Sequence, residues 1–211
     1  MNQEAEIPNR RPLKSRSHPL AQGTAAWLAR HGASPNAISV LSIGFAGAGA
    51  ACLVWAPNVW GLAACALFIQ LRLVCNLLDG MVAVEGGRKT PVGALYNELP
   101  DRVADSLLIV ALGYAVGQPW LGWFGALAAA LTAYIRTLGG ALGQEQDFRG
   151  PMAKQQRMAT MTAACLIGAA ETALTGTRYS LLLGAWIVAV GSALTCVTRS
   201  RAIARRLGAA A

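Results

Sequence analysis

Two groups of polar side chains interrupt an otherwise apolar chain. They are Arg72, Asn76 and Asp79 in one group, and Asn97, Glu98, Asp101 and Asp105 in the other. Arg72, Asn76 and Asp79 are spaced by four and three residues, and Asn97, Asp101 and Asp105 by four and four, which places each set on one face of a helix. Converging carboxylate and amide oxygens suit a hard divalent cation, Mg²⁺ or Mn²⁺. The chemistry that such a site favours is phosphoryl or phosphatidyl transfer, in which the cation neutralises a leaving nucleotide and a carboxylate takes a proton from an attacking hydroxyl.

A purely structural role is the alternative for these residues. Carboxylates at membrane depth are costly unless they face a cavity, a metal ion or an opposite charge. Arg72 and Arg102 lie close enough in the sequence to neutralise Asp79 and Asp101 in an ion-paired helix contact. The residue types alone leave both interpretations open.

The composition predicts that the bilayer surrounds this chain. Hydrophobic residues make up 55% and charged residues 13%, and the mean hydropathy is +0.43. We expect an all-α polytopic membrane protein, because about 20 apolar residues cross the hydrocarbon core as a helix. Six such spans are predicted, at 36–55, 59–84, 93–116, 120–142, 156–174 and 179–197.

The distribution of Lys and Arg predicts the orientation. Basic residues cluster before the first span, in the loops at 88–89 and 149–157, and after the last span, whereas the opposite turns contain only Arg178. Since cytoplasmic loops retain positive charge, both termini are expected in the cytoplasm. We therefore divide the chain into a basic tail with either an interfacial helix or a plain linker (1–33), a six-helix bundle (34–198) and a second basic tail (199–211). Membrane topology and anionic lipid explain the net charge of +8 better than nucleic acid does.

The second and third spans should present their polar faces to each other. The loop between them is short and cytoplasmic, which favours antiparallel neighbours. Gly80 and Gly93 lie beside the polar residues and would permit close approach of the two backbones. The polar groups are thus expected to converge near the inner membrane surface.

The residues around this loop resemble a family signature. The chain reads Asn76-x-x-Asp79-Gly80-x-x-Ala83-Val84, then eight residues, then Gly93-x-x-x-Asn97-x-x-x-Asp101. This is similar to the CDP-alcohol phosphotransferase pattern D-x-x-D-G-x-x-A-R, eight or nine residues, then G-x-x-x-D-x-x-x-D. The resemblance extends from about Ser34 to the C-terminus.

Three positions depart from the family pattern. Asparagine replaces the first and third aspartates, at Asn76 and Asn97, and Val84 replaces the arginine. Asparagine oxygens still ligate a hard cation, but more weakly or for a single ion. The resemblance implies Asp101 as general base; an alternative register, shifted by one helical turn, assigns that role to Asp105.

The resemblance also implies roles for other residues. The expected metal ligands are Asn76, Asp79, Asn97 and Asp101. Candidates for contact with the CMP moiety are Gly80, Ala83, Thr90 and Gly93, for which helix packing is the alternative. Candidates for binding phosphate of the acceptor or of lipid are Arg136, Lys154 and Arg157, although membrane topology alone also explains the last two.

The sequence is compatible with three functions. The first is a metal-dependent transferase that moves a phosphatidyl or substituted phosphoryl group from a CDP-linked donor, expected to be CDP-diacylglycerol, to an alcohol, with release of CMP. The second is a family member that has lost catalysis and binds nucleotide or lipid as a scaffold. The third is a small ion-coupled transporter, although no inverted repeat is found. We expect a multi-pass protein of the cell inner membrane, able to form a homodimer, with its site facing the cytoplasm.

Overall fold

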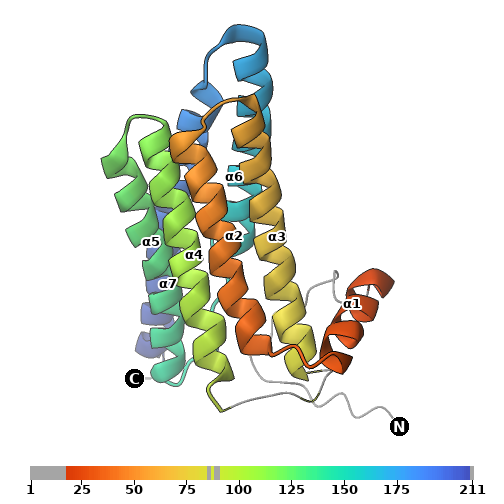
Figure 1. Ribbon diagram of the computed structural model, residues 1–211. Helices are drawn as coiled ribbons and strands as arrows, with labels where there is room; N and C mark the ends of the chain where they lie inside the picture. The colour runs from red at the N-terminus through yellow and green to blue at the C-terminus, as the bar shows by residue number, and fades with distance from the viewer. Residues whose placement is uncertain (1–17, 85–86, 88–90, 210–211) are drawn as a thin grey trace.

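The protein is a bundle of long α-helices with one shorter helix beside it (Figure 1). The computed structural model describes residues 18–84, 87 and 91–209, and this part contains seven helices and no strand. They are α1 (Pro19–Arg30), α2 (Pro35–Trp55), α3 (Val59–Val84), α4 (Gly93–Ala115), α5 (Pro119–Ala141), α6 (Lys154–Thr175) and α7 (Tyr179–Ala209). The prediction of an all-α chain is confirmed.

Five of these helices, α2, α3, α5, α6 and α7, are long and apolar enough to cross a membrane, among the residues that the structure describes. The chain is therefore a polytopic membrane protein. Helix α4 was predicted as a sixth span and is not among the five, because it contains four charged residues, Glu98, Asp101, Arg102 and Asp105. Its 23 residues nevertheless give it the length of its neighbours.

Local sequence signals explain where several helices begin and end. Proline stands in the first turn of α1, α2 and α5, where its missing N–H costs no helical hydrogen bond. Asn58 caps α3, since its Oδ1 accepts hydrogen bonds from the backbone N–H groups of Trp60 and Gly61. Helix α6 ends at Gly176, whose φ of 72° is readily adopted only by glycine.

The helices form a closed ring around an apolar core. Helix α2 packs against both α3 and α4, α5 lies between α4 and α7, and α6 lies between α3 and α7. Helices α3 and α4 touch each other at few positions, so the expected contact between these two spans is made by long polar side chains rather than by close backbone approach. Helix α1 lies to one side, against α3, at the end of the bundle where α7 also ends (Figure 1).

The last helix is longer than its predicted span. Helix α7 continues to Ala209, so the described part of the expected basic tail is helical. Alanine, arginine and leucine favour this conformation, and Ile203 anchors the extension, because it packs where Gly139 leaves space on α5.

The loop between α5 and α6 is fastened to this extension. Arg199 donates hydrogen bonds to the carbonyls of Arg149 and Thr132. Asp147 is paired with Arg149 and Arg206, and the hydrogen bonds from Arg149 hold the pKa of the Asp147 carboxyl below its usual range. The loop that precedes α6 is therefore held in one position relative to the bundle.

A glycine pair permits the tight turn from α4 to α5. A Cβ atom built on Gly113 would lie 2.5 Å from the Cα atom of Gly122, closer than any side chain tolerates. The same substitution at Gly44 on α2 would meet nothing within 4 Å. The close crossing of α4 and α5 thus depends on glycine at position 113.

We expect Gly113→Ala to lower the free energy of unfolding by about 1–3 kcal/mol, the usual cost of overpacking. Gly44→Ala is the matched control and should be neutral or slightly stabilising, because alanine favours helix more than glycine does. Thermal denaturation in detergent checks both variants. Equal melting temperatures for the two variants would contradict the close crossing.

Candidate functional site

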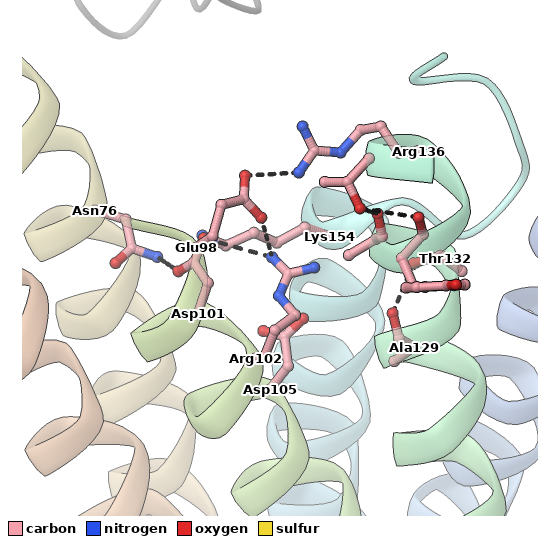
Figure 2. Close-up of polar contacts among 12 residues, drawn as sticks. Asn76, Glu98, Asp101, Arg102, Asp105, Ala129, Thr132, Arg136 and Lys154 are labelled. Carbon is pink, nitrogen blue, oxygen red and sulfur yellow. Dashed lines mark hydrogen bonds and ion pairs between the residues drawn. The ribbon is translucent and has the colours of Figure 1, made fainter. Parts of the chain in front are cut away.

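Polar side chains from four helices converge at the end of the bundle where α3 ends and α4 begins. Figure 2 shows Asn76 from α3, Asp101 and Asp105 from α4, Thr132 and Arg136 from α5 and Lys154 from α6 around one polar region. The predicted convergence of the two polar groups is thus observed. Two further helices, α5 and α6, contribute residues to it.

Asp105 is the buried anchor of this region. Its Oδ1 accepts a hydrogen bond from Arg72 Nη2 at 2.5 Å, and its Oδ2 accepts one from Arg157 Nη2 at 2.9 Å. Arg157 also donates to the carbonyl of Met152 and to Thr132 Oγ1. Asp105, Arg72 and Arg157 are each less than 5% exposed. Both carboxylate oxygens are therefore committed to arginine, and the triad links α3, α4 and α6.

Asp101 lies one turn closer to the start of α4 and has a different set of partners. Its Oδ1 accepts a hydrogen bond from Asn76 Nδ2 at 2.7 Å, and its Oδ2 accepts one from Lys154 Nζ at 2.5 Å. The guanidiniums of Arg72 and Arg102 lie farther away, at 3.5 and 3.7 Å. The Asp101 side chain is 11% exposed, against 4% for Asp105. Asp101 is therefore the carboxylate of the two that a bound molecule can reach more easily.

Asp79, on α3, has different surroundings at its two oxygens. Its Oδ2 accepts a hydrogen bond from Ser39 Oγ on α2. Its Oδ1 is buried and accepts no hydrogen bond from a side chain in the described part of the chain, although the backbone N–H of Gly80 also acts on this carboxylate. Asp79 also lies within electrostatic range of Asp101 and Lys154. A buried carboxylate oxygen without a side-chain donor is the kind of group that a cation satisfies.

The donor set fits a divalent cation only in part. Among the described residues, no three His, Cys, Asp or Glu side chains are arranged to hold a metal ion. Asp79 Oδ1 is available, and the oxygens of Asp101 are shared with Asn76 and Lys154. Asn97 is exposed in the first turns of α4, and its side chain makes no hydrogen bond with the other three predicted ligands in the described part of the chain. One hard ion on Asp79 and Asp101 is compatible with this arrangement.

A second ion pair forms the rim of the region. Arg136 Nη2 donates to Glu98 Oε1 and Arg136 Nη1 to Gln146 Oε1, each at 2.6 Å (Figure 2 shows the first pair). The guanidinium also lies over the ring of Phe148, 5.4 Å from its centroid. Glu98 is thus the anionic partner of Arg136 in this structure.

The predicted nucleotide contacts lie on both sides of the loop between α3 and α4. Gly80 and Ala83 are half-buried in the last turns of α3, and Gly93 is the first residue of α4. Thr90 lies outside the described residues. The contact of these residues with CMP remains a prediction.

Several contacts of the site could not be read from the sequence. Ser39 and Thr132 are ordinary small polar residues in apolar helices, and nothing in their spacing marks them. Arg199 stands at the end of a predicted span, where membrane topology already explained it. The sequence did mark Arg72, because an arginine inside a predicted span needs a carboxylate partner. That partner was expected to be Asp79, seven residues later, but the structure shows that it is Asp105.

An apolar groove of about 620 Å³ lies beside the polar region. It runs between α2 and α4 and reaches Trp123 of α5, and its walls include Gly47, Ala51 and Val110. Arg102 forms part of the wall and, with its guanidinium, also faces Asp101. The groove therefore begins next to the polar region and continues along the bundle toward Trp55.

Two curated relatives resemble the chain in sequence. A phosphatidylinositol phosphate synthase of Streptomyces avermitilis is 31% identical over 186 residues, which cover 83% of this chain and 74% of the relative. An archaetidylinositol phosphate synthase of Aeropyrum pernix is 29% identical over 148 residues, covering 70% of this chain and 74% of the relative.

The fold is also that of a solved enzyme. The Mycobacterium tuberculosis phosphatidylinositol phosphate synthase with CDP-DAG bound superposes with a TM-score of 0.73 at 21% identity, covering 88% of this chain and 94% of that one. Its complex with manganese and citrate also gives a TM-score of 0.73, at 22% identity, and covers 87% and 88%. At this identity the likeness concerns the fold.

The sequence match is broader than the signature around the loop. The family model for CDP-alcohol phosphatidyltransferases matches residues 33–197, which include all six predicted spans and the convergent polar side chains described above. The chain belongs to the CDP-alcohol phosphatidyltransferase family.

Proposed function

We propose that this protein transfers a phosphatidyl group from CDP-diacylglycerol to a hydroxyl of a phosphorylated polyol, of the inositol phosphate class, and releases CMP. The observation that carries the proposal is the position of Asp101: its partly exposed carboxylate is oriented by Asn76 and lies within reach of Lys154 and the Arg136 rim. The names of the two curated relatives support the acceptor class.

Asp101 is the proposed general base. It takes the proton from the acceptor hydroxyl, whose oxygen attacks the phosphorus that carries diacylglycerol, and the bond from that phosphorus to CMP breaks. The hydrogen bond from Asn76 Nδ2 fixes the orientation of the carboxylate. Asp105 is unsuited to this role, since its two oxygens are bound by Arg72 and Arg157; it positions these two guanidiniums instead.

Mg²⁺ or Mn²⁺ is the proposed cofactor. Asp79 and Asp101 would hold it, with the amide oxygens of Asn76 and Asn97 as weaker ligands. The ion would neutralise the charge that develops on the leaving nucleotide. The buried Oδ1 of Asp79, which has no side-chain donor among the described residues, supports this assignment, as does the manganese complex of the solved M. tuberculosis enzyme.

Basic side chains at the rim are proposed to bind the phosphate of the acceptor. Arg136 is the first candidate, because Glu98 and Gln146 present its planar guanidinium beside the site and a phosphate can replace Glu98. Lys154 is the second, since it already contacts Asp101. Arg157 is buried and bound to Asp105, Met152 and Thr132, so we assign it a positioning role.

The lipid donor is proposed to lie across the loop between α3 and α4. Gly80, Ala83, Thr90 and Gly93 would contact the CMP moiety. The apolar groove between α2 and α4 has the volume and the lining for an acyl chain, which favours a lipid-linked donor over a water-soluble CDP-alcohol.

We further propose six membrane crossings with both termini and the site on the cytoplasmic side of the cell inner membrane. Helix α4 would be the sixth crossing, because it packs along α2 and α5 and shares their length. The arginines at 199, 201, 205 and 206, in the extension of α7, favour a cytoplasmic end. Helix α1 would lie on the inner surface, and a homodimer remains our expectation.

A binding protein without catalysis is the second candidate. Asparagine stands at two of the four positions where the resembled signature has aspartate, and Asn97 is exposed without a hydrogen bond to the other three in the described part of the chain. Such a protein would bind nucleotide or lipid as a scaffold and release no CMP. Turnover by the wild-type protein separates the two candidates.

Asp101→Asn should reduce CMP release by about 10²–10⁴-fold, because the amide cannot accept the proton that a general base removes. The assay uses purified protein with CDP-diacylglycerol, inositol phosphate and Mg²⁺ or Mn²⁺. CDP-diacylglycerol binding should persist, since the substitution preserves the side-chain shape.

Glu145→Gln, at an exposed position of the loop before α6, is the control for the loss of one carboxylate and should keep wild-type turnover. Asp101→Asn with wild-type rates would exclude Asp101 as the base.

Arg136→Gln should raise the KM for inositol phosphate by about tenfold or more, the usual effect of losing one charged hydrogen bond of about 1.5–3 kcal/mol. The KM for CDP-diacylglycerol and the kcat should change little, because Arg136 is proposed to bind only the acceptor phosphate. Steady-state kinetics with each substrate varied in turn measure these constants. A rise in the KM for the donor alone would refute the assignment, and Arg201→Gln controls for the lost charge.

A further inference from the structure

Three cations hold the buried carboxylates of the polar region. Arg72 and Arg157 pair with Asp105, Lys154 pairs with Asp101, and Lys154 also lies within electrostatic range of Asp79. A further guanidinium, that of Arg102, lies 3.7 Å from Asp101 and is shared with Glu98. The three aspartates are thus already faced by at least as much positive charge. A divalent cation that joined this set unchanged would leave an excess of positive charge in a medium of low dielectric constant, where such an excess is costly.

Two of the three cations cannot leave. Arg72 and Arg157 are at most 1% exposed, and both hold Asp105. The Lys154 side chain is 25% exposed, and in the described structure its single hydrogen bond is the one to Asp101 Oδ2. Lys154 is also the first residue of α6, so its side chain can turn outward without any change in the helix.

Lys154 is thus hydrogen-bonded to the Asp101 carboxylate, which is one of the two carboxylates proposed to ligate the divalent cation. Its ammonium neutralises Asp101, and it lies close enough to Asp79 to act on that carboxylate too. Asp79 Oδ1 is buried and accepts no hydrogen bond from a side chain in the described part of the chain, although the backbone N–H of Gly80 also acts on this carboxylate. A cation on Asp79 Oδ1 and Asp101 would satisfy this oxygen and repel the ammonium.

We propose that Lys154 competes with the divalent cation for Asp101, so that its ammonium lies on the carboxylate that the ion would ligate and is displaced when the ion binds. The proposal rests on the proposed function for the existence of the cation site. It concerns binding, however, and is measured without turnover.

The test is a Mn²⁺ titration of the full-length protein in nanodiscs of zwitterionic phosphatidylcholine, followed by the electron paramagnetic resonance signal of free Mn²⁺. Lys154→Met keeps most of the side chain and removes its charge. Because it removes a like charge from a buried cation site, it should bind Mn²⁺ at least about tenfold more tightly than the wild type. Lys154→Arg keeps the charge and should bind Mn²⁺ as weakly as the wild type.

Arg201→Met is the matched control, since Arg201 is exposed on α7 and makes no hydrogen bond or ion pair with the described residues. It should leave Mn²⁺ affinity unchanged. Equal or weaker binding by Lys154→Met, an equal gain in Arg201→Met, or the absence of Mn²⁺ binding in both the wild type and Lys154→Met would each overturn the proposal. Tighter binding by Lys154→Met in a protein that releases no CMP would uphold the competition and refute the proposed function.

Discussion

The ion pairs of Asp105 with Arg72 and Arg157 are the interaction on which the rest of the site depends. Charges at this depth are tolerated only when they are paired, and these three side chains are almost completely buried. They join α3, α4 and α6 at one point, although α3 and α4 hardly touch through their backbones. Removal of one partner from such a triad leaves a buried charge unpaired, which commonly costs about 3–5 kcal/mol.

The triad explains why the neighbouring carboxylate can take part in chemistry. Because Asp105 holds Nη2 of both Arg72 and Arg157, Asp101 is left with one amide, one lysine and two more distant guanidiniums. These contacts leave part of the Asp101 carboxylate exposed. Helix α4 therefore carries two aspartates one turn apart with different roles: Asp105 is held by two arginines, and Asp101 remains accessible to a bound molecule. The difference comes from their hydrogen-bond partners, since the residue type is the same.

Much of the fold could be predicted from the sequence because the bilayer imposes simple rules. The five apolar helices begin and end within two residues of their predicted spans, apart from the end of α7, since apolar length and helix-breaking turns determine those limits. The extension of α7 was missed, because a run of arginine and alanine reads equally well as a tail or as a helix. The packing of α3 and α4 on α2 was also missed, because a short loop indicates proximity and does not indicate which faces touch.

The site was predictable in its residue types and less so in its contacts. The spacing of the residues correctly predicted that Asn76 and Asp101 lie together, whereas the partners of Asp79 and Arg72 depend on three-dimensional packing that no local pattern records.

The most direct test of the proposed activity is CMP release by the wild-type protein from CDP-diacylglycerol and inositol phosphate, before and after chelation of divalent cations. We predict turnover that chelation abolishes and added Mn²⁺ restores; the absence of turnover with both substrates and the metal present would contradict the proposed transferase activity.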